Sequence, residues 1–122
     1  MKLLGEIIVI VMLKKSEAKE PFSFSFVNAN DESIVKSENY AAKRSALNGI
    51  ESIKKNCTDD NRYELKESKN GKFFFNIKAT NGQIIGTSKL FATEEIRNSS
   101  ISQLKTEACD AELFEIASSA QT

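Results

Sequence analysis

The feature that most constrains the fold is an internal repeat, in which the second half of the sequence resembles the first. Shifting the 122-residue sequence by 51 positions superposes Pro21–Lys66 on Lys72–Ala117 without a gap. Aromatic and aliphatic positions coincide along the overlap: Phe22 with Phe73, Phe24 with Phe75, Ile34 with Ile85, Tyr40 with Phe91, Ile50 with Ile101 and Tyr63 with Phe114. Self-similarity at a fixed period indicates one structural unit that is repeated and that buries its apolar face against its neighbour.

Each unit opens with strand patterns. Phe22, Phe24 and Phe26 alternate with serines, which is typical of a strand with one buried face. In the second unit Phe73, Phe75 and Ile77 occupy the buried face, whereas Asn76 and Lys78 point away. Phe74 breaks the alternation, so we expect its side chain to be exposed or to cover the outer face. Third strands are expected near residues 33–37 and 84–88.

The turns follow from Asn-Gly pairs. Asn81-Gly82 predicts a two-residue type I′ hairpin, and Asn30-Asp31 takes the same place in the first unit with a weaker residue than glycine. Asn70-Gly71 predicts an earlier tight turn that pairs Arg62–Glu67 with Lys72–Ala79. Its counterpart, at residues 14–21, lacks the pair and is expected to be longer.

Each unit ends with a helix. Ala42–Lys55 places Ala46, Leu47, Ile50 and Ile53 on one apolar stripe. The second helix is expected to start at Thr93 as N-cap, with a thinner stripe of Ile96, Ile101 and Leu104. Gly49 disfavours a helix interior by about 1 kcal/mol relative to alanine, so we expect a close approach of this helix to the sheet.

The predicted fold is therefore α+β, with tandem β-β-β-α repeats that form one antiparallel sheet and two helices packed on one face. Residues 112–117 match the opening strand of the second unit and are expected to complete the sheet. We predict a single compact domain over residues 1–122, made of repeat 1 (6–57), repeat 2 (58–108) and a closing strand and tail (109–122).

The apolar N-terminal stretch superficially resembles a signal peptide. Gly5-Glu6 interrupts it, Lys14-Lys15 ends it, and no small-residue cleavage site follows. Its β-branched residues favour a strand over Ile7–Leu13 that is buried on both faces. We therefore expect a cytoplasmic protein without a membrane partner, with a secreted form as the minority hypothesis.

Composition excludes several chemistries. The chain has no histidine, two cysteines, and 17 basic against 17 acidic side chains. These counts exclude a Ser-His-Asp triad, a histidine-ligated metal and a four-cysteine zinc site. We expect no enzyme activity, no cofactor and no metal. We also expect Cys57 and Cys109 to be free thiols, because one bridge is not a disulfide framework.

Two stretches resemble the YegP-like family, which comprises small bacterial proteins of unknown function. One contains Tyr63–Lys66, Ser68–Phe73, Phe75, Ile77–Ala79, Asn81–Gln83 and Ile85–Ser88, and the other Lys36–Glu38, Tyr40, Asn48–Ile50 and Ser52–Asn56. The resemblance implies a tandem-repeat form of a fold that also occurs as dimers of single repeats. It further implies a continuous antiparallel sheet, both helices on one face, and exchange of the terminal segment between units. It implies no catalytic or binding residue.

Three departures from the family pattern occur: an unusually apolar N-terminal strand, a first hairpin without Asn-Gly, and Asn98-Ser99-Ser100 in the second helix. The second unit is accordingly expected to be less tightly packed than the first.

Two functional hypotheses remain. The first is a small non-enzymatic interaction or scaffold module whose exposed sheet face or edge meets a protein partner, as a monomeric pseudo-dimer or a weak homodimer. The alternative is a weak nucleic-acid-binding protein that uses the outer sheet face, with Lys72, Phe74, Asn76 and Lys78 as surface contacts. Zero net charge disfavours this alternative, because binding to nucleic acid relies on several contacts between basic residues and phosphates.

Overall fold

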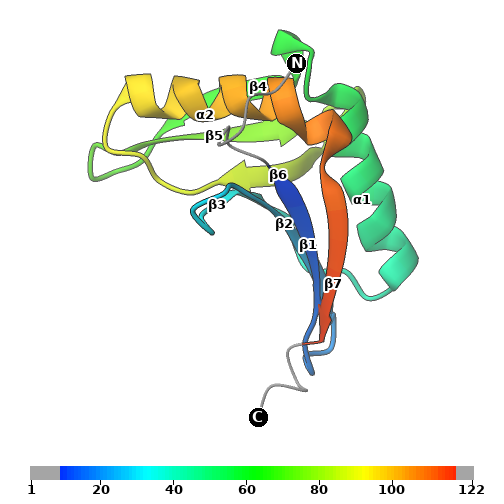
Figure 1. The fold of residues 1–122 in the computed structure, drawn as a ribbon. Helices are drawn as coiled ribbons and strands as arrows, with labels where there is room; N and C mark the ends of the chain where they lie inside the picture. Colours follow the sequence, from blue (N-terminus) through cyan, green and yellow to red (C-terminus); the bar gives the residue numbers. More distant parts are fainter. Residues whose placement is uncertain (1–8, 118–122) are drawn as a thin grey trace.

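A computed structural model describes residues 9–117, and within them one seven-stranded sheet is covered by two helices (Figure 1). The strands are β1 (Ile10–Lys15), β2 (Phe22–Val27), β3 (Ser33–Lys36), β4 (Tyr63–Glu67), β5 (Phe73–Lys78), β6 (Ile84–Ser88) and β7 (Glu112–Ala117). The helices are α1 (Lys43–Asn56) and α2 (Glu94–Glu107), followed by short 3₁₀ turns η1 (Asp60–Arg62) and η2 (Ala108–Asp110). The sheet order is β4-β5-β6-β3-β2-β1-β7.

The predicted repeat is confirmed as a β-β-β-α unit that occurs twice. The units meet where β3 pairs antiparallel with β6, so the other strands extend outward from this central pair. Equivalent contacts recur in both halves: an isolated bridge joins Phe22 to Tyr40 in the first and Phe73 to Phe91 in the second. The rings stack in the same way, Phe24 on Tyr40 and Phe75 on Phe91.

The closing strand is confirmed, but its direction corrects the prediction of a fully antiparallel sheet. β7 pairs with β1 in parallel, from Ile10 beside Glu112 to Lys15 beside Ala117. The chain leaves β6, crosses the sheet as α2 and reaches the far edge, and a crossover of this kind is what parallel neighbours require. The last strand of the second unit thus lies beside the first unit, as the family resemblance implied. In Figure 1, β7 runs alongside β1.

The turn type was predicted wrongly. Gly82 has a φ of 87° and Asp31 a φ of 66°, whereas Asn81 is not among the residues with positive φ. The Gly82 N–H donates to Ala79 O at 2.9 Å, and the Ala79 N–H donates to Gln83 O at 2.9 Å. This pattern is a type I turn followed by one left-handed residue, which is the three-residue hairpin and not the two-residue type I′ hairpin. The Asn70-Gly71 turn and the Asn30-Asp31 turn close in the same way.

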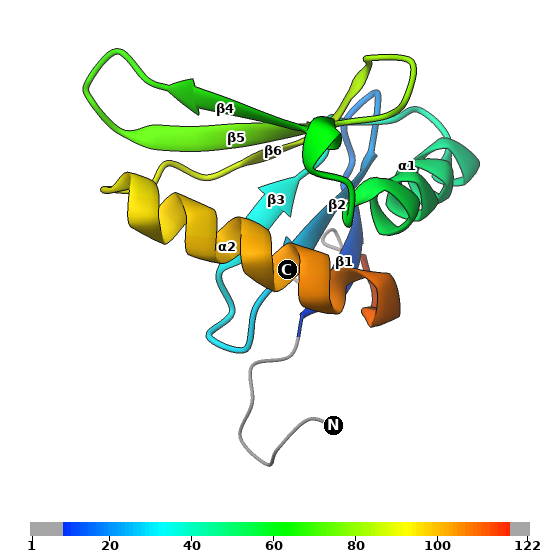
Figure 2. The same ribbon diagram turned by 90° about the horizontal axis from the view of Figure 1, so that it is seen from above.

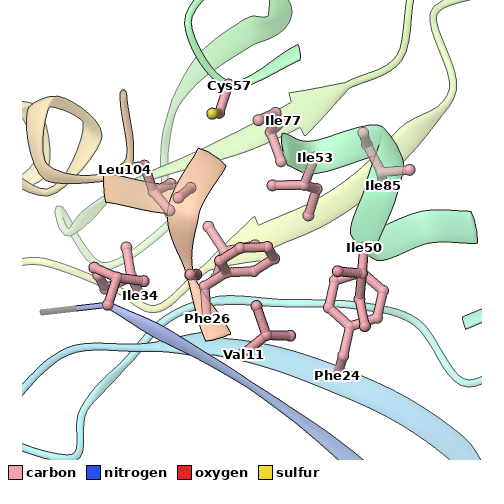
Figure 3. Close-up of a cluster of buried hydrophobic side chains, with 14 of the residues drawn as sticks. Val11, Phe24, Phe26, Ile34, Ile50, Ile53, Cys57, Ile77, Ile85 and Leu104 are labelled. Atoms are coloured by element: carbon pink, nitrogen blue, oxygen red, sulfur yellow. The ribbon is translucent and has the colours of Figure 1, made fainter. Parts of the chain in front are cut away.

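The first helix packs as predicted, with Ala46, Ile50 and Ile53 buried. Gly49 lies so close to the sheet that a Cβ there would approach Phe24 and the Tyr40 hydroxyl to 2.9 Å, which confirms the expected close approach. A cluster of buried apolar side chains from both units forms the core between sheet and helices (Figure 3).

The second helix differs from its prediction at one position. Thr93 is the N-cap, with its side chain accepting from the Ile96 N–H. Ile96 is 49% exposed, however, and Arg97 is buried in its place beside Ile101 and Leu104.

The N-terminal strand is confirmed from Ile10 onward but is not buried on both faces. Val11 and Leu13 are buried, whereas Ile10 and Met12 between them are half-buried. Residues 1–8 of the apolar stretch lie outside the described residues. Figure 2 shows the twist of the sheet, with α1 and α2 on the same side of it.

Candidate functional site

Three of the four predicted contact residues share the outer face of β5, away from the helices. Phe75 and Ile77 are fully buried, so the alternating residues Phe74, Asn76 and Lys78 lie on the outer face. Asn76 is only 7% exposed there, because Glu64 of β4 and Thr87 of β6 contact it on either side, so its side chain is not the open surface contact that was predicted. Phe74 is half-buried. Lys72 is exposed and lies in the β4–β5 turn, one step before this row. The register therefore places the predicted contacts in one line.

Two of these side chains are already engaged within the protein. Asn76 donates to Glu64 Oε1 at 3.0 Å and accepts from the Thr87 hydroxyl at 2.7 Å. Lys78 Nζ lies 3.6 Å from the second carboxylate oxygen of Glu64. The amide hydrogen bond from Asn76, assisted by Lys78 and Lys66, holds the pKa of Glu64 below its usual value. The outer face of β4, β5 and β6 is thus joined by a polar network.

A second surface feature lies at the edge of the sheet. Among residues 9–117, β4 has one neighbouring strand, β5, and its other edge pairs with none. The Ser68 N–H donates to Lys72 O at 2.8 Å, which fixes the β4–β5 register. Because antiparallel strands alternate the direction of their backbone groups, this register directs the N–H and C=O of Leu65 and Glu67 toward the open edge.

A surface pocket of mixed polar and apolar lining borders this edge between β4 and α2. It is lined by Tyr63 and Leu65 of β4, by Asn98, Ile101, Ser102 and Lys105 of α2, and by Asp60 of η1. Leu65 is 54% exposed although it points to the helix side of the sheet, the same side as Tyr63. We call β4, with this pocket, the β4 edge.

Arg97 positions the start of α2 against the β4 edge. Its guanidinium lies 5.6 Å from the centre of the Phe73 ring, and its Nη1 donates to Lys66 O at 3.4 Å. Sequence reasoning identified neither Arg97 nor Leu65. A signal for Arg97 existed, because the repeat aligns it with Ala46, a residue of the predicted apolar stripe.

Two kinds of feature are absent from the described part of the chain, metal-ligand clusters and membrane-spanning helices. Within residues 9–117, no group of three or more histidine, cysteine, aspartate or glutamate side chains is arranged to hold a metal ion. Across the same residues, no helix is both long and apolar enough to cross a membrane.

Comparisons with known proteins agree on one family. The model of DUF1508, a domain of unknown function, matches residues 18–64 and again residues 68–115. The UPF0339 protein in the ptx operon 5' region of Stutzerimonas stutzeri is 45% identical over 95 residues, which cover 78% of this chain and 86% of the relative. The UPF0339 protein YegP of Escherichia coli (strain K12) is 44% identical over 93 residues, covering 76% and 84% of the two chains.

Solved structures give the same result. The solution NMR structure of yegP from E. coli, described as a protein of unknown function, superposes with a TM-score of 0.82 at 38% identity and covers 93% of this chain and 97% of its own. The solution NMR structure of the UPF0339 protein SO3888 from Shewanella oneidensis has a TM-score of 0.83 at 34% identity, with 89% and 92% covered. The resemblance seen in the sequence is confirmed.

Proposed function

This chain belongs to the DUF1508 family, whose function is not established, and we propose that it is a non-enzymatic interaction module that binds an extended segment of a partner protein along β4. An open strand edge is a ready template for β-augmentation, in which a peptide adds a strand through main-chain hydrogen bonds. The observation that carries the proposal is a difference between the two repeats at this edge.

Equivalent leucines in the two repeats have opposite environments. Leu13 pairs with Phe24, and Leu65 pairs with Phe75, so the repeat relates the two leucines. Leu13 is 3% exposed, whereas Leu65 is 54% exposed. The first leucine lies beside β7, which occupies the outer edge of β1, and the second has no such neighbour among residues 9–117. An added strand beside β4 would cover Leu65 as β7 covers Leu13.

The β1–β7 pair also defines the chemistry of the occupant. Glu115 of β7 lies beside Leu13, and it forms an ion pair of 2.8 Å with Lys43 in the first turn of α1. The repeat aligns Lys43 with Glu94, an acidic residue in the first turn of α2. A lysine or arginine beside Leu65, where β7 has a glutamate, therefore favours a segment that runs parallel to β4, and this charge sets the preference between peptides more than the affinity.

Synthetic peptides test this arrangement. The first peptide has the sequence of residues 111–117 with Glu115→Lys, and the second keeps the glutamate. We expect the lysine peptide to shift the amide NMR signals of β4 saturably and more strongly than the glutamate peptide. In the variant Glu94→Lys the preference should reverse, because the charge facing the peptide is reversed.

Matched variants distinguish specific binding at the β4 edge from nonspecific binding to exposed apolar side chains. Leu65→Ala should weaken binding of the lysine peptide, whereas Leu90→Ala, which removes an equally exposed leucine elsewhere, should leave it unchanged. Equal effects of both variants, or no saturable shift on β4, would contradict the proposal.

A single-stranded oligonucleotide is the competing ligand. Salt-dependent shifts centred on Lys72 and Phe74, without any peptide binding, would favour the nucleic-acid hypothesis instead.

A further inference from the structure

The two cysteines of the chain lie side by side although 52 positions separate them. Cys57 follows the last residue of α1, and Cys109 lies in η2 just before β7. Their Sγ atoms are 3.7 Å apart. Both thiols also face one carbonyl, Lys54 O, at 3.6 Å from Cys57 Sγ and 3.3 Å from Cys109 Sγ. The fold thus brings the two thiols together, although the sequence repeat does not predict this contact.

The two thiols differ in access. Cys57 is fully buried within the core cluster, where Figure 3 shows its sulfur among the apolar side chains, and Cys109 is exposed. A disulfide needs the two sulfurs to approach to about 2.05 Å, which is a short movement from a van der Waals contact. An accessible thiol backed by a buried one is the arrangement of an attacking and a resolving cysteine.

We propose that Cys57 and Cys109 form a reversible dithiol–disulfide site that exchanges with small acidic disulfides of the glutathione class. The Cys109 thiolate attacks one sulfur of the small disulfide, which forms a mixed disulfide and releases one small thiolate. Cys57 then transfers its proton to that thiolate and attacks the sulfur of Cys109, which releases the second small thiolate. This second thiolate takes up from water the proton that Cys109 gave to water when it ionised. The protein loses two thiol hydrogens and gains one S–S bond, while the small disulfide is reduced to two thiols.

Physical differences between the cysteines set this order. Burial, with the hydrogen bond to Cys109, raises the pKa of Cys57 to about 12, so Cys57 is protonated at neutral pH and does not start the exchange. Its neighbour reaches solvent through an open surface pocket of α1 and the β5–β6 turn. The burial of Cys57 and the solvent access of Cys109 therefore favour one order of steps, in which Cys109 attacks first and Cys57 resolves the mixed disulfide.

The pocket gives the site its preference for acidic reagents. Its charged lining residues are Lys54 and Lys55 against one acidic residue, Glu51. The excess of positive charge favours a disulfide whose ends carry carboxylates over one whose ends carry amines.

Intact-mass analysis of the reduced full-length protein tests the chemistry. After incubation with oxidised glutathione and blocking of free thiols, the protein should have lost two hydrogens and retained no glutathione. Cys57→Ser should stop at a stable mixed disulfide on Cys109, because no resolving thiol remains. Cys109→Ser should react more slowly than Cys57→Ser, on the order of tenfold or more.

Controls keep these outcomes interpretable. Circular dichroism must show that both serine variants keep the native fold, since serine replaces a buried sulfur in one of them. Wild-type protein that retains glutathione without an internal bond, or variants that react at equal rates, would overturn the proposed pair. Cystamine, an amine-bearing disulfide, should react more slowly than oxidised glutathione, and an equal or faster rate would refute the role of Lys54 and Lys55.

Discussion

Removing the closing strand should destabilise the protein by an amount that the repeat itself allows one to estimate. In a chain that ends at Asp110, the outer edge of β1 becomes like the β4 edge. Leu13 would then change from 3% exposure toward the 54% of its equivalent Leu65. Exposing about half of a leucine side chain costs about 1 kcal/mol.

The apolar residues of β7 itself add to this loss. Ala111 is buried and Ile116 is half-buried, while Leu113 and Phe114 each keep roughly half of their surface covered. Together they contribute about 4 kcal/mol, at the same rate as for Leu13. The free energy gained from the hydrogen bonds between β1 and β7 is roughly offset by the conformational entropy that is lost when β7 becomes ordered. The exposed Lys43–Glu115 pair adds little. The expected loss is therefore about 5 kcal/mol, or on the order of 15 °C in Tm for a chain of this length.

Urea denaturation and calorimetry measure this loss, with a chain that ends at Ala117 as the control because it keeps all of β7. Amide hydrogen exchange adds a local readout, since the protection of β1 should fall while that of β5 remains. A Tm that differs from the control by less than about 2 °C would refute the inference that β7 covers the β1 edge.

Three further predictions concern the positions where the repeats differ. Thr93→Ala removes the N-cap of α2 and should cost about 1 kcal/mol, whereas Ala42→Ser at the equivalent, uncapped start of α1 should stabilise by a similar amount in urea denaturation. Asp31→Gly relieves a φ of 66° and should raise the free energy of unfolding by up to about 1 kcal/mol, with the equivalent Gly82→Asp lowering it. Because the folded pKa of Glu64 lies below its usual value, its stabilisation is present above the unfolded pKa and is lost as the pH falls through the folded pKa. Glu64→Gln should therefore lower Tm at neutral pH, and the difference from the wild type should shrink as the pH falls through the folded pKa of Glu64.

The strand and helix order was predictable because each element has its own strong local signal, and the repeat supplied each signal twice. The alternating phenylalanines of β2 and β5 indicated one buried face, and Phe24, Phe26 and Phe75 are fully buried. The Thr93 cap also followed from the sequence. These features depend on residues close in sequence, so no knowledge of the tertiary structure was needed.

The errors occurred where a local signal fits two structures. Asn-Gly suits a type I′ turn and also the last two positions of the three-residue turn, and the ladder bond from Ala79 to Gln83 decides between them. Hydropathy predicts Ile96 for the inner face of the second helix and gives no reason to place Arg97 there. Arg97 occupies the inner position because its long side chain lies on the Phe73 ring while its guanidinium reaches a backbone carbonyl.

The β4 edge and the thiol pair could not be predicted, because both depend on which distant elements become neighbours. The opening strand of the repeat occurs three times, as β1, β4 and β7. β1 and β4 each form a hairpin with the next strand, whereas β7 does not and can join the sheet beside either β1 or β4. The third copy, β7, occupies the position beside β1, so the equivalent position beside β4 is left open among residues 9–117. Periodicity shows how many copies exist and does not show which end of the sheet the last copy joins.

The two proposed sites are linked through Tyr63, the first residue of β4. The Tyr63 hydroxyl donates to Cys57 O at 2.6 Å, and the same side chain lines the pocket of the β4 edge together with Leu65. A Cys57–Cys109 bond would close a loop of roughly 50 residues and tether β7, with a stabilisation of up to about 4 kcal/mol in the chain-entropy treatment. The bond would form next to Tyr63, and Leu65 lies two residues further along β4. Oxidation should therefore raise Tm and shift the amide signals at Tyr63, while the lysine peptide still binds beside Leu65. A loss of peptide binding on oxidation would contradict this expectation and would show that the contact between Tyr63 and Cys57 couples the thiol pair to the whole β4 edge.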